Sequence, residues 1–184
     1  LEIAEEVCGD QDMLELLTHL VDKSLVFVNQ EEEANPRYYL HETIRQYTRE
    51  KLIDSGEYIE LRDRHRDVYL AFVERIEPEF IRAQQKKWLD AMESEIDNLR
   101  SAIRWSIENS HAEQALRFCA ASINFWNRRG HAAEAVIFCK DALTSVEEND
   151  NIRTTTLHAS VVAAVWWFRR IVEPLISWSD ESTL

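Results

Sequence analysis

The sequence predicts a mainly α-helical protein with one small β-hairpin near its N-terminus. Only three Gly and three Pro occur among 184 residues, which leaves little turn chemistry for a protein built from sheets. Apolar residues recur at helical spacing along most of the chain. Two short runs of strand-forming residues, 25–28 and 37–40, flank the polar stretch 31–36. An apolar content of 45% is enough for a packed core and argues against wholesale disorder.

The N-terminal third alternates helices with this hairpin. Residues 1–7 read as the tail of a helix, and the acidic stretch 10–12 offers a capping residue for the next one. Apolar residues form a helical stripe between 13 and 21. The hairpin follows, with a six-residue loop at 31–36. A further helix begins at Glu42 and ends near Ser55, because Gly56 can adopt the left-handed conformation that terminates helices.

Beyond residue 57 the apolar pattern is purely helical. A stripe from Leu61 to Ile76 predicts one amphipathic helix that Pro78 ends. A second long stripe runs from Trp88 to Ile107. Three further helices are expected at 112–127, 132–146 and 152–172. The helix at 112–127 is apolar on two sides, so other helices must cover it on both.

An internal repeat supports a stacked helical array in this region. Residues 110–119 match residues 130–139 at an offset of 20, with His, two Ala, Phe and Cys identical. A helix-plus-turn unit of this length is typical of repeat proteins. Around Gly130 the pattern resembles a tetratricopeptide repeat. The apolar run 161–168 has no polar face, and this predicts an exposed apolar patch on the last helix.

The stretches Leu17–Val26 and Leu40–Tyr47 together resemble the winged-helix module of the STAND family of signalling ATPases, which includes NB-ARC and AP-ATPase-like proteins. The family's Met-His-Asp motif reads Leu40-His41-Glu42 in this sequence. The resemblance implies that His41 touches the β-phosphate of bound ADP, close to a helix N-terminus that favours anions. The alternative is that His41 caps its own helix or bonds a backbone carbonyl.

The resemblance implies two domains: a winged-helix part of a nucleotide-binding switch at 1–57 and a tetratricopeptide-like sensor at 58–184. The function it implies is the regulatory and sensor segment of an ATP-binding signalling protein or transcriptional regulator. ADP or ATP would bind the parent protein rather than this segment alone. The implied partners are an upstream nucleotide-binding domain and an inducer, either protein or small molecule, on the helical array. A truncated array would also self-associate through its exposed C-terminal helix.

Charge and cysteine usage set further expectations. Residues 1–60 carry 5 Lys or Arg against 15 Asp or Glu, a net charge of −10. DNA binding needs cations against phosphate, so we expect no direct nucleic-acid partner. No apolar stretch is long enough to span a membrane. Three cysteines without a short-range pairing pattern favour a reduced, cytoplasmic compartment.

Other functional readings remain open. A helical-repeat adaptor with no nucleotide role would need only the array. An enzyme is not expected, because no nucleophile motif or glycine-rich phosphate loop is present. Cys119 and Cys139 look like buried packing residues. Each lies eight residues from His111 or His131, about 12 Å along a helix, too far to share a metal ion. Arg45 could face the same site as His41 but is expected to be a solvated helix charge. Asp22 and Lys23 are expected to fix the helix-to-strand turn rather than to bind a ligand.

Overall fold

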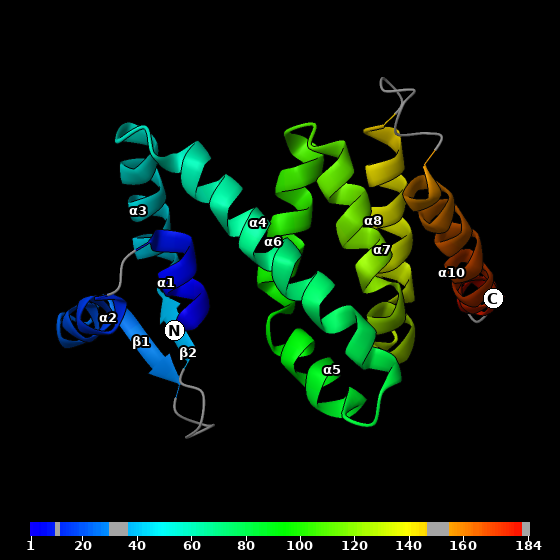
Figure 1. Ribbon diagram of the computed structural model, residues 1–184, viewed down its shortest axis with the longest axis horizontal. Coiled ribbons are helices and arrows are strands. Elements are labelled where there is room, and N and C mark those ends of the chain that lie inside the picture. The colour runs from blue at the N-terminus through cyan, green and yellow to red at the C-terminus, as the bar shows by residue number, and fades with distance from the viewer. Residues whose placement is uncertain (10–11, 30–36, 147–154, 182–184) are drawn as a thin grey trace. The chain divides into compact units, whose positions relative to one another are not determined.

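The computed structural model describes residues 1–9, 12–29, 37–146 and 155–181, and side chains of the last helix as far as residue 173. Helices account for most of the described residues, together with one two-stranded antiparallel sheet (Figure 1). The elements are α1 (Glu2–Cys8), α2 (Met13–Asp22), β1 (Val26–Asn29), β2 (Arg37–Leu40), α3 (Glu42–Asp54), α4 (Tyr58–Ile76), the 3₁₀-helix η1 (Glu77–Ile81), α5 (Gln85–Ser94), α6 (Ile96–Glu108), α7 (Ala112–Arg129), α8 (Ala132–Thr144) and α10 (Thr156–Glu181). The predicted fold class, mainly helical with one hairpin, is confirmed.

The chain divides into two compact units, Leu1–Val68 and Tyr69–Leu184. The division falls inside α4, which runs as one helix through it. The domain boundary that the sequence predicts after residue 57 therefore stays a prediction. Among the described residues, no helix is both long and apolar enough to cross a bilayer.

The first unit is built around the hairpin and α2. Phe27 pairs with Tyr39, and Val26 with Leu40, across the antiparallel ladder. The expected six-residue loop at 31–36 lies outside the described residues. Within the described part of this unit, Met13 and Val26 are the apolar side chains that are fully buried. Little apolar area is therefore removed from water here, and the hydrophobic contribution to stability is small.

The second unit holds the core of the protein. Helices α6, α7, α8 and α10 lie side by side (Figure 1), with α7 contacting the other three. Its largest fully buried side chains include Phe80, Phe118, Phe125 and Phe168. Each buried aromatic contributes about 1.5–3 kcal/mol relative to an exposed one. The expectation that the helix at 112–127 is covered on both sides is confirmed.

The long stripe from Trp88 to Ile107 forms two helices rather than one. The break is at Glu95, which has φ −102° and ψ 10° and ends α5 before α6 begins. The Glu95 carboxylate accepts hydrogen bonds from the Tyr69 hydroxyl at 2.7 Å and from the Asn98 amide at 2.8 Å. The apolar period continues across the break, so periodicity could not reveal it. The hydrogen bond from the Tyr69 hydroxyl in α4 is made at this break.

The last helix also differs from expectation at its C-terminal end. The sequence predicts that this helix ends at Val172. Helix α10 continues to Glu181 and includes Pro174. Helix α10 packs on α7 and α8. The predicted apolar patch is present, since Val162, Trp166, Trp167 and Ile171 are exposed.

The internal sequence repeat corresponds to a repeat in the structure. His111 and His131 both occupy the N-cap position, of α7 and α8 respectively. Each follows a residue in the left-handed region, Ser110 with φ 60° and Gly130 with φ 80°. The matched alanines, phenylalanines and cysteines are all buried: Ala112, Ala132, Ala115, Ala135, Phe118, Phe138, Cys119 and Cys139. The repeat thus encodes two consecutive helices that enter the core by the same local geometry.

One titratable group within the apolar face of α4 ties stability to pH. Burial, followed by the charge of Arg62, lowers the pKa of His65 from 6.5 to about 4. The unfolded chain therefore binds more protons than the folded chain between pH 6.5 and pH 4. Stability due to neutral His65 is fully present above pH 6.5 and is lost as the pH falls toward 4.

We expect His65→Gln to reduce the acid sensitivity of folding. Between pH 7 and pH 5 the wild type should lose about 1–2 kcal/mol more than the variant in free energy of unfolding. Urea denaturation at both pH values measures this difference, and an NMR titration of the His65 ring measures the pKa directly. Equal losses in the two proteins, or a ring titration near 6.5, would contradict the assignment.

Candidate functional site

The C-terminal end of α1, which precedes α2 in the chain, is held by a backbone bond and by a side-chain bond. Gly9 ends α1 in the left-handed conformation with φ 70° and donates its N–H to the Glu5 carbonyl at 2.7 Å. Arg64 donates from Nη1 to the Val7 carbonyl at 3.2 Å. The same Nη1 lies 3.0 Å from where a Cβ on Gly9 would stand. The end of α1 is therefore fixed by a glycine conformation and by a guanidinium from α4, within the same unit.

The turn from α2 into β1 is held by backbone bonds. Ser24, with φ 57°, donates to the Val21 carbonyl at 2.8 Å, and Leu25 donates to the Leu20 carbonyl at 2.9 Å. Asp22 and Lys23 were expected to fix this turn. Both side chains are exposed, and among the described residues neither makes a hydrogen bond or ion pair. Their side chains are available for contact with a partner.

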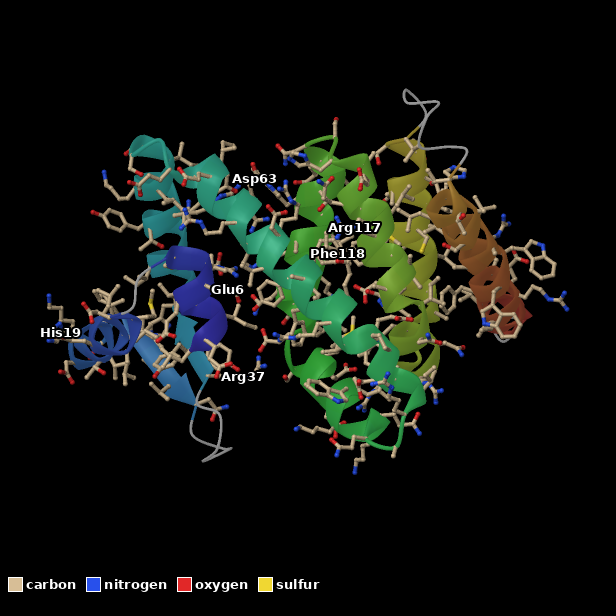
Figure 2. The ribbon with its side chains drawn as sticks, in the orientation of Figure 1. Glu6, His19, Arg37, Asp63, Arg117 and Phe118 are labelled. Atoms are coloured by element: carbon tan, nitrogen blue, oxygen red, sulfur yellow. The ribbon has the colours of Figure 1, made fainter. Side chains whose placement is uncertain are left out.

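The exposed side of α2 is mixed in character. It carries Leu14 and Leu16, which are 55% and 45% exposed, together with Glu15, Thr18 and His19. No Lys or Arg lies within the helix, and Lys23 is its C-cap. His19 on α2 and Arg37 on β2 are labelled in Figure 2. Lys23 at the end of α2, Arg37 on β2 and Arg64, which bonds the end of α1, are thus cations of this unit.

His41 lies at the corner between β2 and α3. It is the N-cap of α3, with φ −59° and ψ 145°, and its carbonyl accepts the Arg45 N–H at 2.8 Å. Its side chain makes no capping hydrogen bond. The ring is exposed and meets Phe27 edge-on, with centroids 4.2 Å apart and planes at 78°. The structure therefore does not support the alternative that His41 caps its own helix.

The sequence analysis missed the aromatic contact of His41. Because Phe27 pairs with Tyr39 and side chains alternate along a strand, Tyr39 and His41 point to the face that carries Phe27. Phe27 and Tyr39 are 40% and 47% exposed. An exposed aromatic face therefore adjoins the N-terminus of α3. Hairpin register was the signal that could have identified it.

Arg45 does not join His41 in a shared site. Its guanidinium forms an ion pair with Glu42 one turn earlier, and both side chains are mostly exposed. An exposed pair of this kind contributes little stability. The expectation that Arg45 is a solvated helix charge is confirmed.

The histidine and cysteine repeat holds no metal site in the part of the chain that the structure describes. There, no three His, Cys, Asp or Glu side chains group closely enough to hold an ion. Cys119 and Cys139 are completely buried, as expected for packing residues. Contact with Cys139, and then burial, raises the pKa of Cys119 well above its usual value. His131 lies 3.1 Å from the Glu93 carboxylate and stacks on Phe125 at 5.5 Å, a tertiary contact the sequence did not reveal.

Comparison with known proteins indicates which kind of domain the elements of the first unit make up. Residues 4–53 match the family model of a winged helix-turn-helix domain. Relatives in Mycobacterium tuberculosis strains H37Rv and CDC 1551 and in Mycobacterium bovis are named as candidate HTH-type transcriptional regulators. Each is 37% identical over 151 residues, covering 82% of this chain and 17% of the relative. No solved structure matches the chain.

Residues 4–53 of the first unit are therefore a winged helix-turn-helix segment, and the chain is similar to candidate transcriptional regulators. This overturns the expectation that the chain has no direct nucleic-acid partner, because a helix-turn-helix match and regulator relatives point to DNA binding. The expectation rested on the net charge of a whole segment, which governs long-range attraction and not fold. The matches do not extend to a nucleotide-binding family or to tetratricopeptide repeats, so both remain predictions.

We expect Gly9→Ala to destabilise the chain more than Gly56→Ala. Both glycines have positive φ, 70° and 79°, so alanine costs about 1 kcal/mol at either position. Only at position 9 does the new Cβ displace Arg64 from the Val7 carbonyl, which costs about 1 kcal/mol more. Urea denaturation measures both variants. In an Arg64→Ala background the two costs should become equal, and equal costs in the wild-type background would contradict the role given to Arg64.

Proposed function

We propose that this chain is a regulatory segment of a transcriptional regulator, in which the winged helix contacts DNA and the helical array binds an effector. The observation that carries the proposal is the helix-turn-helix followed by a hairpin in residues 4–53, within 151 residues that are 37% identical to candidate regulators. The chain spans 17% of the length of those relatives. The activity of a whole regulator is accordingly part of the proposal.

The electrostatics of the first unit set the character of the DNA contact. Lys23 and Arg37 flank the helix-turn-helix and hairpin, while Glu15 and Asp22 repel phosphate. Two phosphate contacts would give a slope of about −2 in log affinity against log salt. This salt dependence is shallow for a DNA-binding protein. Tight DNA binding would therefore need further contacts from other parts of a regulator. The helical array supplies a second surface on which an effector could act.

We expect the chain to bind duplex DNA weakly at low salt, with this shallow slope. Fluorescence anisotropy of a labelled duplex, recorded from about 20 to 200 mM salt, measures both quantities. Lys23→Ala with Arg37→Ala should abolish the salt dependence, whereas Lys140→Ala on α8 should leave it unchanged. Absence of binding at the lowest salt, or binding that the paired substitution does not alter, would refute DNA contact by this surface.

A second role is favoured by the geometry of His41. Its ring is exposed at a strand-to-helix corner, makes no capping bond, and lies beside the positive end of α3. This is the placement that a phosphate contact requires. We therefore also propose that the winged helix reports nucleotide state, with His41 contacting a phosphate of ADP held by a neighbouring domain of the regulator.

The test of the second role is nucleotide retention in the full-length regulator. His41→Ala should lower the ADP that co-purifies by about tenfold, since a charge-assisted hydrogen bond is worth about 1.5–3 kcal/mol. His19→Ala, an exposed histidine of the same unit, is the matched control. Unchanged ADP content in His41→Ala, measured by chromatography of the denatured protein, would remove His41 from nucleotide recognition without affecting the DNA proposal.

A further inference from the structure

A groove between α6 and α8 has the size of a small-molecule site. Its volume is about 430 Å³, within the range of about 300–1,000 Å³ typical of ligand pockets. Phe138 forms the floor and is 5% exposed, while Ile107 and Ile137 form apolar walls on the two helices. Ile137 is 58% exposed. An apolar ligand body would therefore gain burial on both sides.

The charged residues of the groove come from both helices. Arg104 lies on α6 with its guanidinium over the Phe138 ring, 5.8 Å from the centroid. Glu134 is already engaged, because Arg100 donates to its two carboxylate oxygens at 2.6 and 3.0 Å. Glu108 on α6 and Asp141 on α8 remain, and within the described residues neither carboxylate has a cationic partner. The groove thus offers two uncommitted carboxylates beside an apolar floor.

The length of the groove along α8 favours a small molecule over a partner helix as its ligand. On α8 the lining runs from Glu134 to Asp141, about 10 Å of helix rise. This is too short to seat an amphipathic partner helix along several turns. It fits a compact molecule with one apolar body and one charged end.

We propose that this groove binds a small organic cation, an amine or guanidine carried on an apolar body. The apolar body packs on Phe138, Ile107 and Ile137, and the cation lies between Glu108 and Asp141. With Glu134 paired to Arg100, the uncommitted carboxylates of Glu108 and Asp141 outnumber the guanidinium of Arg104, so the charge of the groove is complementary to a cation. This deepens the effector-binding role proposed for the array, but its test reads binding alone and is independent of DNA contact.

An anionic ligand is the competing possibility, because Arg104 also lines the groove. Arg104 is held against the Phe138 face, and this cation–π contact stabilises its charge. An anion bound there would approach Glu108, one turn along α6, and would be repelled. The two possibilities predict opposite responses to a change in ligand charge.

The test is an NMR titration of the ¹⁵N-labelled full chain with 4-phenylbutylamine. Its controls are 4-phenylbutan-1-ol and 4-phenylbutyrate, which keep the apolar body and change only the end group. For a ligand of this size we expect a dissociation constant of about 1–5 mM for the amine. The alcohol should bind about tenfold more weakly, and the carboxylate should not bind measurably. The largest amide shifts should fall in 104–108 and 134–141.

Glu108→Gln with Asp141→Asn should weaken amine binding about tenfold, while Glu113→Gln on α7, outside the groove, should not. Amine affinity in the wild type should fall as salt is raised, and alcohol affinity should not, which tests the charge contact without any variant. The proposal is overturned if the carboxylate binds as well as the amine, if the paired substitution leaves amine affinity unchanged, or if the shifts lie elsewhere on the chain.

Discussion

The burial of helix α7 on two sides is the constraint on which the second unit depends. A helix that is apolar on two sides is stable in water only when neighbours cover both. Helices α6, α8 and α10 do this, together with η1 and α5. Small buried residues let these neighbours approach closely, and large ones fill the space between them. The buried residues of α7 are Ala112, Ala115, Leu116, Phe118, Cys119, Ala121, Ser122, Phe125 and Trp126.

Ion pairs between helices accompany this packing. Arg117 donates to both carboxylate oxygens of Glu74 at 2.7 Å, and joins α7 to α4. Arg100 makes a similar two-point contact with Glu134, which raises the pKa of Arg100 and joins α6 to α8. Two-point arginine contacts are directional, so they specify how helices are placed along one another. Their net contribution to stability is modest because the groups are partly exposed.

The two units differ in how many apolar side chains they bury. The second has a dense core, while the first buries few apolar side chains and exposes aromatic and aliphatic ones beside a largely acidic sequence. The charge of residues 1–60 suggested that nucleic acid was excluded, and that inference failed. Net charge describes the average field of a segment, whereas recognition depends on the few side chains at a contact. In this unit the side chains of Lys23 and His41 are exposed.

The sequence by itself determined where most of the helices lie and several of their ends, because these follow from local rules: apolar spacing, Pro78 after α4, and left-handed Gly56 and Gly130. It also determined that α7 is buried on two sides and that the apolar patch of α10 is exposed. The contact of Phe27 with His41 is consistent with the alternation of side chains along a strand. The pairing register of β1 with β2 must be known before that contact can be derived. Only the tertiary structure decided the break at Glu95, the contact of His131 with Glu93 and the groove between α6 and α8. Each of these joins side chains far apart in sequence, and local periodicity carries no information about which distant residues meet.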